Sequence, residues 1–201
     1  MLGRSGEESR DVLIRMDNTM MEKMKYYTFQ LILSGISEPD DNIEDALYES
    51  GCDDALLYFK NSISFLEFDR KAGSIRQAII SAIKDVENAG IGVKVVHVAP
   101  GDIVTAAEIA RRVKLTKEYI RLLTQGKRGP GDFPLPHSLI ANTTLWSWAE
   151  ISKWMYTHTK LKDKEIATNA QFLKDINQVM EIREHKGTYQ TQKKILQELE
   201  K

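Results

Sequence analysis

The 201-residue sequence contains a single cysteine, and it has no long apolar run. One thiol, Cys52, excludes a disulfide within the chain and a cysteine-based zinc site. No segment approaches the ~18 consecutive apolar residues of a membrane-spanning helix, and the first residues lack the apolar core of a signal peptide. We therefore expect a cytoplasmic protein that is not associated with a membrane.

The sequence also lacks an overall excess of charge of one sign, because its net charge is -1. This average conceals two segments of opposite sign. Tyr26–Ala99 contains 6 Lys/Arg and 12 Asp/Glu, a net charge of -6, whereas Pro100–Lys160 contains 9 and 5, a net charge of +4. The flanks are near neutral, with 5 against 5 in Met1–Lys25 and 8 against 7 in Leu161–Lys201. The overall charge therefore argues against a uniformly basic nucleic-acid-binding surface, and any contact with phosphates would need the positive charge of Pro100–Lys160.

Motifs of catalysis and of cofactor binding are missing from the sequence. It has no phosphate-binding glycine loop, no Ser-His-Asp order and no HExxH motif. The four histidines are scattered: His97, His137, His158 and His185. Acidic residues beside Cys52 would raise its pKa, which disfavours a nucleophilic thiol. We expect no enzyme activity and no cofactor.

An acidic set in the N-terminal half raises the question of a cation site. Its members are Asp40, Asp41, Glu44, Asp45, Asp53 and Asp54. They lack the alternating ligands and the central glycine of a calcium loop, and carboxylates are common at helix starts because they favour the helix dipole. We therefore predict helix starts here and no metal.

Segment Tyr26–Ala99 shows the pattern of an α+β domain. Aromatic and β-branched runs predict four strands, and two capped or amphipathic segments predict helices between them. The strands are expected at Tyr26–Ile36, Ala55–Lys60, Ile63–Asp69 and Val93–Val98, and the helices from Asp41 or Asn42 to about Ser50 and from Ser74 to Gly90. Asn61 and Ser62 indicate a hairpin turn. This order of elements is the βαββαβ arrangement of a ferredoxin-like domain.

The stretch Thr105–Thr124 has the pattern of a helix-turn-helix. Its apolar residues have the offsets that two steeply packed helices need: Ile109, Ala110, Val113, Leu115, Ile120 and Leu123. Thr105 with Glu108 predicts a capping box at the first helix. Thr116 is predicted to cap the second helix. In a recognition helix, the first exposed residues after the cap are the ones that reach base edges. Lys114 stands where the turn commonly has glycine, so we expect backbone strain there if φ is positive.

The residues after this pair predict the rest of a small domain. Gln125–Pro136 is a turn-rich loop, Ser138–Trp146 predicts a hairpin, and Ser147 with Glu150 predicts a second capping box. The helix that follows has Ile151, Trp154 and Met155 on one face. We expect Trp146 and Trp154 to complete the core, although tryptophans at these spacings could also stack on bases.

Both ends of the chain leave alternatives open. Met1–Lys25 is interpreted as a mobile arm or as an amphipathic helix that uses Val12, Leu13, Met16 and Met20. After a charged linker, Lys160–Lys164, helices are expected at Ile166–His185 and Tyr189–Leu199. The first of these helices is expected to bury one apolar face, formed by Ile166, Leu173, Ile176, Val179 and Met180. Such a stripe needs either the chain's own body or a second subunit. We therefore predict four regions: Met1–Lys25, Tyr26–Ala99, Pro100–Lys160 and Leu161–Lys201.

The segments EIARRVKLTKEYIRLLTQGKRGPGDFPLP and LWSWAEISKWM resemble the winged helix-turn-helix of the MerR and phage excisionase group. Together with Glu49–Ala55 and Phe68–Arg70, they resemble uncharacterised bacterial proteins that join a ferredoxin-like half to such a domain. The resemblance implies sequence-directed binding to duplex DNA, as in a transcriptional regulator.

The resemblance also implies the residues that contact DNA. The recognition helix would present Thr116, Lys117, Glu118, Tyr119 and Arg121; Arg111 and Arg112 would lie near the DNA backbone; and Lys127 and Arg128 would lie on the wing. A single recognition helix has a small footprint, so we expect a homodimer, formed through the C-terminal helices or the sheet. The alternative function is that of a protein-interaction adaptor, such as an antitoxin or a defence-system accessory, whose acidic N-terminal domain binds a protein partner.

Overall fold

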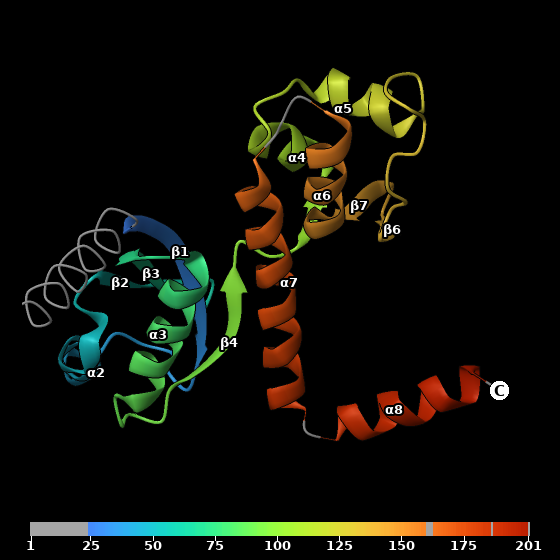
Figure 1. The fold of residues 1–201 in the computed structure, drawn as a ribbon. Helices are drawn as coiled ribbons and strands as arrows, with labels where there is room; N and C mark the ends of the chain where they lie inside the picture. The colour runs from blue at the N-terminus through green and yellow to red at the C-terminus, as the bar shows by residue number, and fades with distance from the viewer. Residues whose placement is uncertain (1–23, 160–162, 186, 201) are drawn as a thin grey trace, which may run out of the picture. The chain divides into compact units, whose positions relative to one another are not determined.

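The computed structural model describes residues 24–159, 163–185 and 187–200. The predicted N-terminal arm or helix lies almost wholly outside these residues. The chain divides into two compact units, Met1–Val95 and Val96–Lys201. Each combines helices with a small antiparallel sheet, so the predicted α+β class is confirmed (Figure 1).

A four-stranded sheet organises the first unit. Its strands are β1 (Lys25–Ser34), β2 (Ala55–Lys60), β3 (Ile63–Ala72) and β4 (Lys94–Ala99), in the order β2-β3-β1-β4. The boundary between the two units falls within β4, so its residues from Val96 onward belong to the second unit. Strand β3 pairs antiparallel with both β1 and β2. Side chains alternate across the sheet, so Phe29 and Phe68, which are directly opposite, stack on the buried face with centroids 5.2 Å apart.

The helices of this unit begin at polar caps. Helix α3 (Ile75–Asn88) starts after Ser74, whose hydroxyl accepts from the Gln77 amide, and it buries Ala78, Ile79, Ala82, Ile83 and Val86 against the sheet (Figure 1). Helix α2 (Asp41–Leu47) is capped by Asp40, one residue before the predicted cap, and it continues into the short π-helix η1 (Tyr48–Cys52). The predicted Asn61–Ser62 turn is confirmed, with positive φ at both residues.

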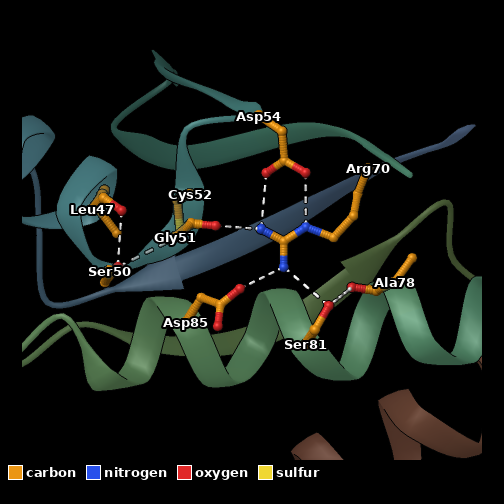
Figure 2. A network of polar contacts seen from close by, with 9 residues as sticks. All are labelled: Leu47, Ser50, Gly51, Cys52, Asp54, Arg70, Ala78, Ser81 and Asp85. Carbon is orange, nitrogen blue, oxygen red and sulfur yellow. Dashed lines mark hydrogen bonds and ion pairs between the residues drawn. The ribbon is translucent and has the colours of Figure 1, made fainter. Parts of the chain in front are cut away.

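A buried arginine connects three parts of the first unit (Figure 2). Arg70 on β3 donates from Nε and Nη2 to the Asp54 carboxylate, each at 2.8 Å. Its Nη1 donates to Asp85 at 2.6 Å and to Ser81 at 3.0 Å, both on α3, and Nη2 also donates to the Gly51 carbonyl at 2.6 Å. All five N–H donors of the guanidinium therefore have partners.

The burial of Arg70 is not predicted by its sequence neighbourhood. Burial by itself would lower the pKa of its guanidinium, but hydrogen bonds to Asp54 and Asp85 outweigh that effect and raise it. The guanidinium also lies over the Phe68 ring, 4.8 Å from the centroid. Because Arg70 ties β3 to η1 and α3, it organises this side of the core.

The second unit contains a three-stranded sheet and five helices among its described residues. The strands β5 (Ile103–Thr105), β6 (Ser138–Ile140) and β7 (Thr143–Ser147) lie in the order β5-β7-β6. The helices are α4 (Ala106–Arg112), α5 (Lys117–Thr124), α6 (Trp148–His158), α7 (Lys164–Glu184) and α8 (Thr188–Leu199). The β6–β7 hairpin is as predicted, whereas β5 was not anticipated because three residues carry too little periodicity to show a strand.

One apolar core joins α4, α5, α6 and α7. It contains Ile109, Ala110, Val113, Ile120 and Leu123, as predicted, and Trp146, Trp154, Ile151 and Met155. Leu115 and Ile166 are partly buried against it. The tryptophans are therefore core residues and are not exposed for stacking on bases.

Helix α7 packs against α6, so the chain's own body covers its inward face (Figure 1). The buried positions are Ala170, Leu173, Asn177 and Met180. The prediction was wrong at Val179, which is 46% exposed. Asn177 takes the inward position because its amide pairs with the main chain of Val98, accepting from N and donating to O at 2.8 Å each. The spacing of apolar residues along the sequence cannot predict that a polar residue occupies one of the buried positions.

Helix α8 differs from the others because its described side chains are all exposed. Among them are the apolar residues Tyr189, Ile195, Leu196 and Leu199. In the part of the chain that is described, no helix has both the length and the apolar character needed to cross a membrane.

Candidate nucleic-acid interface

Helices α4 and α5 both begin at threonine caps, as predicted. The Thr105 hydroxyl accepts from the Glu108 amide at 3.2 Å, and the Thr116 hydroxyl accepts from the Tyr119 amide at 3.1 Å. Thr116 is therefore occupied in holding the start of α5. The first exposed side chains after it are those of Lys117 and Glu118.

The predicted capping box at α4 is only half formed, because the Thr105 hydroxyl accepts from the Glu108 amide but the Glu108 carboxylate bonds to arginine side chains. The Glu108 carboxylate accepts hydrogen bonds from Arg111 at 2.8 and 2.6 Å and from Arg112 at 2.8 Å. The bond from Arg111, followed by that from Arg112, lowers the pKa of Glu108 to about 2 although burial opposes the change. Glu108 is therefore used to orient two arginines. In the same way, at α6 the Ser147 hydroxyl accepts from the Glu150 amide, while the Glu150 carboxylate pairs with Lys174.

The two arginines at the end of α4 have different surroundings. The Arg111 side chain is 73% exposed, whereas that of Arg112 is only 13% exposed. Arg112 lies over the Trp148 ring, 5.1 Å from its centroid, and its Nη2 approaches the Gly101 carbonyl. Arg111 can therefore reach a ligand, while Arg112 braces α4 against α6.

The turn between the helices has the strained residue that the sequence indicates. Lys114 has φ 54° and follows the end of α4. Its amide donates to the Arg111 carbonyl and the Leu115 amide donates to the Ala110 carbonyl, which is the Schellman pattern at a helix end. This position favours glycine, so a lysine here retains strain from its Cβ.

Replacing Lys114 with glycine should stabilise the second unit by about 1 kcal/mol, because glycine adopts positive φ without a steric penalty. Urea unfolding followed by tryptophan fluorescence measures this unit, since all three tryptophans lie in it. Lys114→Ala is the matched control, because it removes the same charge and keeps the Cβ. Equal stabilities of the two variants would contradict the strain at this residue.

The solvent-facing side of α5 carries charged side chains. Lys117, Glu118 and Arg121 are exposed on it, opposite the buried Ile120 and Leu123. Arg121 donates to Glu118 through Nε at 2.7 Å and Nη2 at 2.6 Å. Its Nη1 donates to the Gln125 side chain at 2.8 Å. The exposed face of α5 is therefore an ordered polar surface.

The loop after α5 carries the predicted basic pair, Lys127 and Arg128. It begins with a second Schellman pattern, in which Gly126 has positive φ and the Lys127 amide donates to the Leu122 carbonyl. Arg128 lies over the Tyr119 ring, 4.3 Å from the centroid. This contact places Arg128 beside α5.

Contacts with the core hold this loop in place. Gly129 has φ +74°, and a Cβ there would lie 3.2 Å from Leu123 and 3.5 Å from the Trp154 ring. The Trp154 indole donates to Asp132 at 2.9 Å, and Phe133 packs edge-on against the same ring with centroids 5.0 Å apart. The loop is therefore packed against the core of the second unit.

The β-hairpin of this unit is separate from the basic pair. Lys127 and Arg128 precede the hairpin, and its turn consists of Ala141 and Asn142, both with positive φ. The apolar residues Leu139 and Ile140 are exposed beside the turn. The hairpin turn is thus uncharged, and the positive charge lies in the loop that directly follows α5.

The thiol of Cys52 is buried in the first unit. Burial raises the pKa of the Cys52 thiol to about 11, with smaller contributions from Asp85 and Asp54 in the same direction. Burial, and not the acidic neighbours, is thus the main cause of the raised pKa. Across residues 24–159, 163–185 and 187–200, no three His, Cys, Asp or Glu side chains form a group suited to a metal ion.

Comparisons with known proteins add no assignment, because no protein-family model, curated protein or solved structure matches the chain significantly. The geometry of the α4–α5 region must therefore carry the functional interpretation.

Proposed function

We propose that the second unit binds duplex DNA as a winged helix-turn-helix, with α5 as the recognition helix, and that the protein is a bacterial cytoplasmic transcriptional regulator. The observation that carries this proposal is the position of the basic side chains. Lys117 and Arg121 lie on the exposed face of α5, and Arg128 is held beside it by Tyr119. Phosphate and base contacts would then come from one continuous surface.

The architecture supports the same proposal. The resemblance to the MerR and excisionase group implies a helix pair, a loop with glycine and Phe-Pro, and a tryptophan-containing helix, and α4, α5 and α6 follow in this order. In the first unit, the strand order β2-β3-β1-β4 agrees with a ferredoxin-like domain. That fold hosts many activities, so the proposed function rests on the second unit alone.

Duplex binding should be measurable by fluorescence anisotropy with the full chain at about 50 mM salt. The duplexes would be the region upstream of the protein's own operon and an unrelated sequence of equal length. We expect tighter binding to the former and a steep loss of affinity as salt rises, since Lys and Arg contacts release counterions. Absence of binding to either duplex at low salt would refute the proposed function.

We further propose that the protein dimerises through α8. A lone helix of 12 residues is marginal in water. Tyr189, Gln192, Leu196 and Leu199 follow heptad spacing along α8. Lys193 and Lys194 precede Glu198 and Glu200, so an antiparallel pair of α8 helices would bring opposite charges together.

Light scattering at tens of micromolar should therefore give the mass of a dimer. Leu196→Asp should raise the dissociation constant roughly tenfold or more, because it removes a buried leucine from the pair. Gln197→Asp introduces the same charge beside the stripe and serves as the control. A strict monomer, both with and without DNA, would show that α8 has another role.

A further inference from the structure

Glu118 and Arg121 form an ion pair with two hydrogen bonds on the exposed face of α5. The carboxylate accepts from Nε and from Nη2, so it occupies one edge of the planar guanidinium. The Gln125 side chain accepts from Nη1. Both members remain accessible, with side chains 50% exposed for Arg121 and 60% for Glu118. A ligand can therefore approach Arg121 while its pair with Glu118 is intact.

The donors that remain on Arg121 suit one ligand in particular. A guanidinium has five N–H groups, of which Glu118 takes two and Gln125 takes one. One N–H on each of Nη1 and Nη2 is left. Two such donors match the O6 and N7 acceptors that guanine presents in the major groove.

This inference rests on the proposed function. We propose that Glu118 is a positioning residue that holds Arg121 for bidentate recognition of guanine. Without the carboxylate, the long side chain of Arg121 would sample many rotamers and would contact phosphates as readily as bases. With it, the guanidinium has a defined plane and the nearby negative charge disfavours a phosphate. The pair therefore converts a basic side chain into a selective one.

The electrostatics of α5 agree with this role. The hydrogen bond from Arg121 lowers the pKa of Glu118, and Lys127 contributes in the same direction. The carboxylate is thus ionised at neutral pH. Lys117 and Lys127 are exposed, so they suit phosphates, which need charge and little orientation.

Binding-site selection with the full-length protein and a random duplex library supplies the probe for a test. The recovered duplex should contain a guanine at which 7-deazaguanine, which lacks the N7 acceptor, lowers wild-type affinity by about tenfold. Inosine at the same position keeps O6 and N7 and should leave the affinity unchanged. In Glu118→Gln, the loss caused by 7-deazaguanine should fall below about threefold, while affinity for an unselected duplex rises.

Two further variants separate positioning from a general loss of charge. Arg121→Lys keeps the charge but has no planar fork, so it should also lose the response to 7-deazaguanine. Lys127→Ala should weaken all duplexes by a similar factor and retain that response. Circular dichroism would confirm that each variant is folded.

The outcomes distinguish this inference from the proposed function. A selected site that the wild type binds without dependence on guanine N7 would overturn the inference and leave DNA binding standing. The inference is overturned in the same way if Glu118→Gln keeps the wild-type ratio of selected to unselected affinity. If the wild type selects no sequence and binds no duplex at low salt, both the inference and the proposed function are refuted.

Discussion

Arg70→Ala is expected to destabilise the first unit by about 3–5 kcal/mol, the range typical of breaking a buried ion pair from one side. The substitution would leave the carboxylates of Asp54 and Asp85 without their guanidinium partner, and the Gly51 carbonyl would lose a donor. Because Arg70 is only 7% exposed, water cannot fully replace these bonds.

Urea unfolding followed by far-UV circular dichroism would measure this loss. Arg70→Lys should recover only part of the stability, since an ammonium cannot satisfy the Asp54 carboxylate through two parallel N–H groups. Lys71→Ala is the control, because this neighbouring basic residue is exposed. Its effect should stay within about 0.5 kcal/mol.

A further variant tests the cause of the instability. Replacing Asp54 and Asp85 with asparagine in the Arg70→Met background removes the stranded charges and should regain stability relative to Arg70→Ala. If Arg70→Ala unfolds at the same urea concentration as the wild type, the network does not stabilise the unit.

The double variant Lys117→Glu/Lys127→Glu should weaken the proposed DNA binding by roughly a hundredfold or more at 100 mM salt, because each change replaces attraction to a phosphate with repulsion. The two lysines belong to the exposed face of α5 and to the loop directly after it. The slope of affinity against salt should also fall by about two, one for each lost phosphate contact.

A matched pair of reversals controls for net charge. Lys60→Glu/Lys84→Glu changes the total charge equally but alters exposed lysines of the first unit. Its anisotropy titration should differ from the wild type by no more than a few-fold, an effect of long-range electrostatics. Equal losses in the two double variants would mean that α5 has no special part in binding.

Local features of both units, such as helix caps and turns, could be predicted from the sequence. The caps at Ser74, Thr105 and Thr116 and the turn at Asn61–Ser62 depend on residues within three or four positions of one another. The spacing of apolar residues likewise identified the buried faces of α3, α4 and α5. Such signals are local, so they survive without knowledge of the fold.

The candidate site could be predicted in its composition but not in its arrangement. The sequence shows that Arg111, Arg112 and Arg128 are basic, but it does not show where their side chains point. Arg112 points inward because its guanidinium lies over the ring of Trp148, which is 36 residues further along the chain. Arg128 is held at α5 by Tyr119, and the ordered loop depends on Trp154. These contacts form only when the core brings the segments together.

The sequence by itself determined the positions of most helices and strands, with β5 and the π-helix η1 as exceptions, together with the charge asymmetry between the units and the unusual lysine at the α4–α5 turn. These properties follow from composition and from interactions along a single helical turn or hairpin. Only the tertiary structure decided that Arg70 is buried with all five donors used, and that Asn177 replaces an apolar side chain on α7. The physical reason is that a buried polar group is stable only when its partners surround it, and here they come from distant parts of the chain.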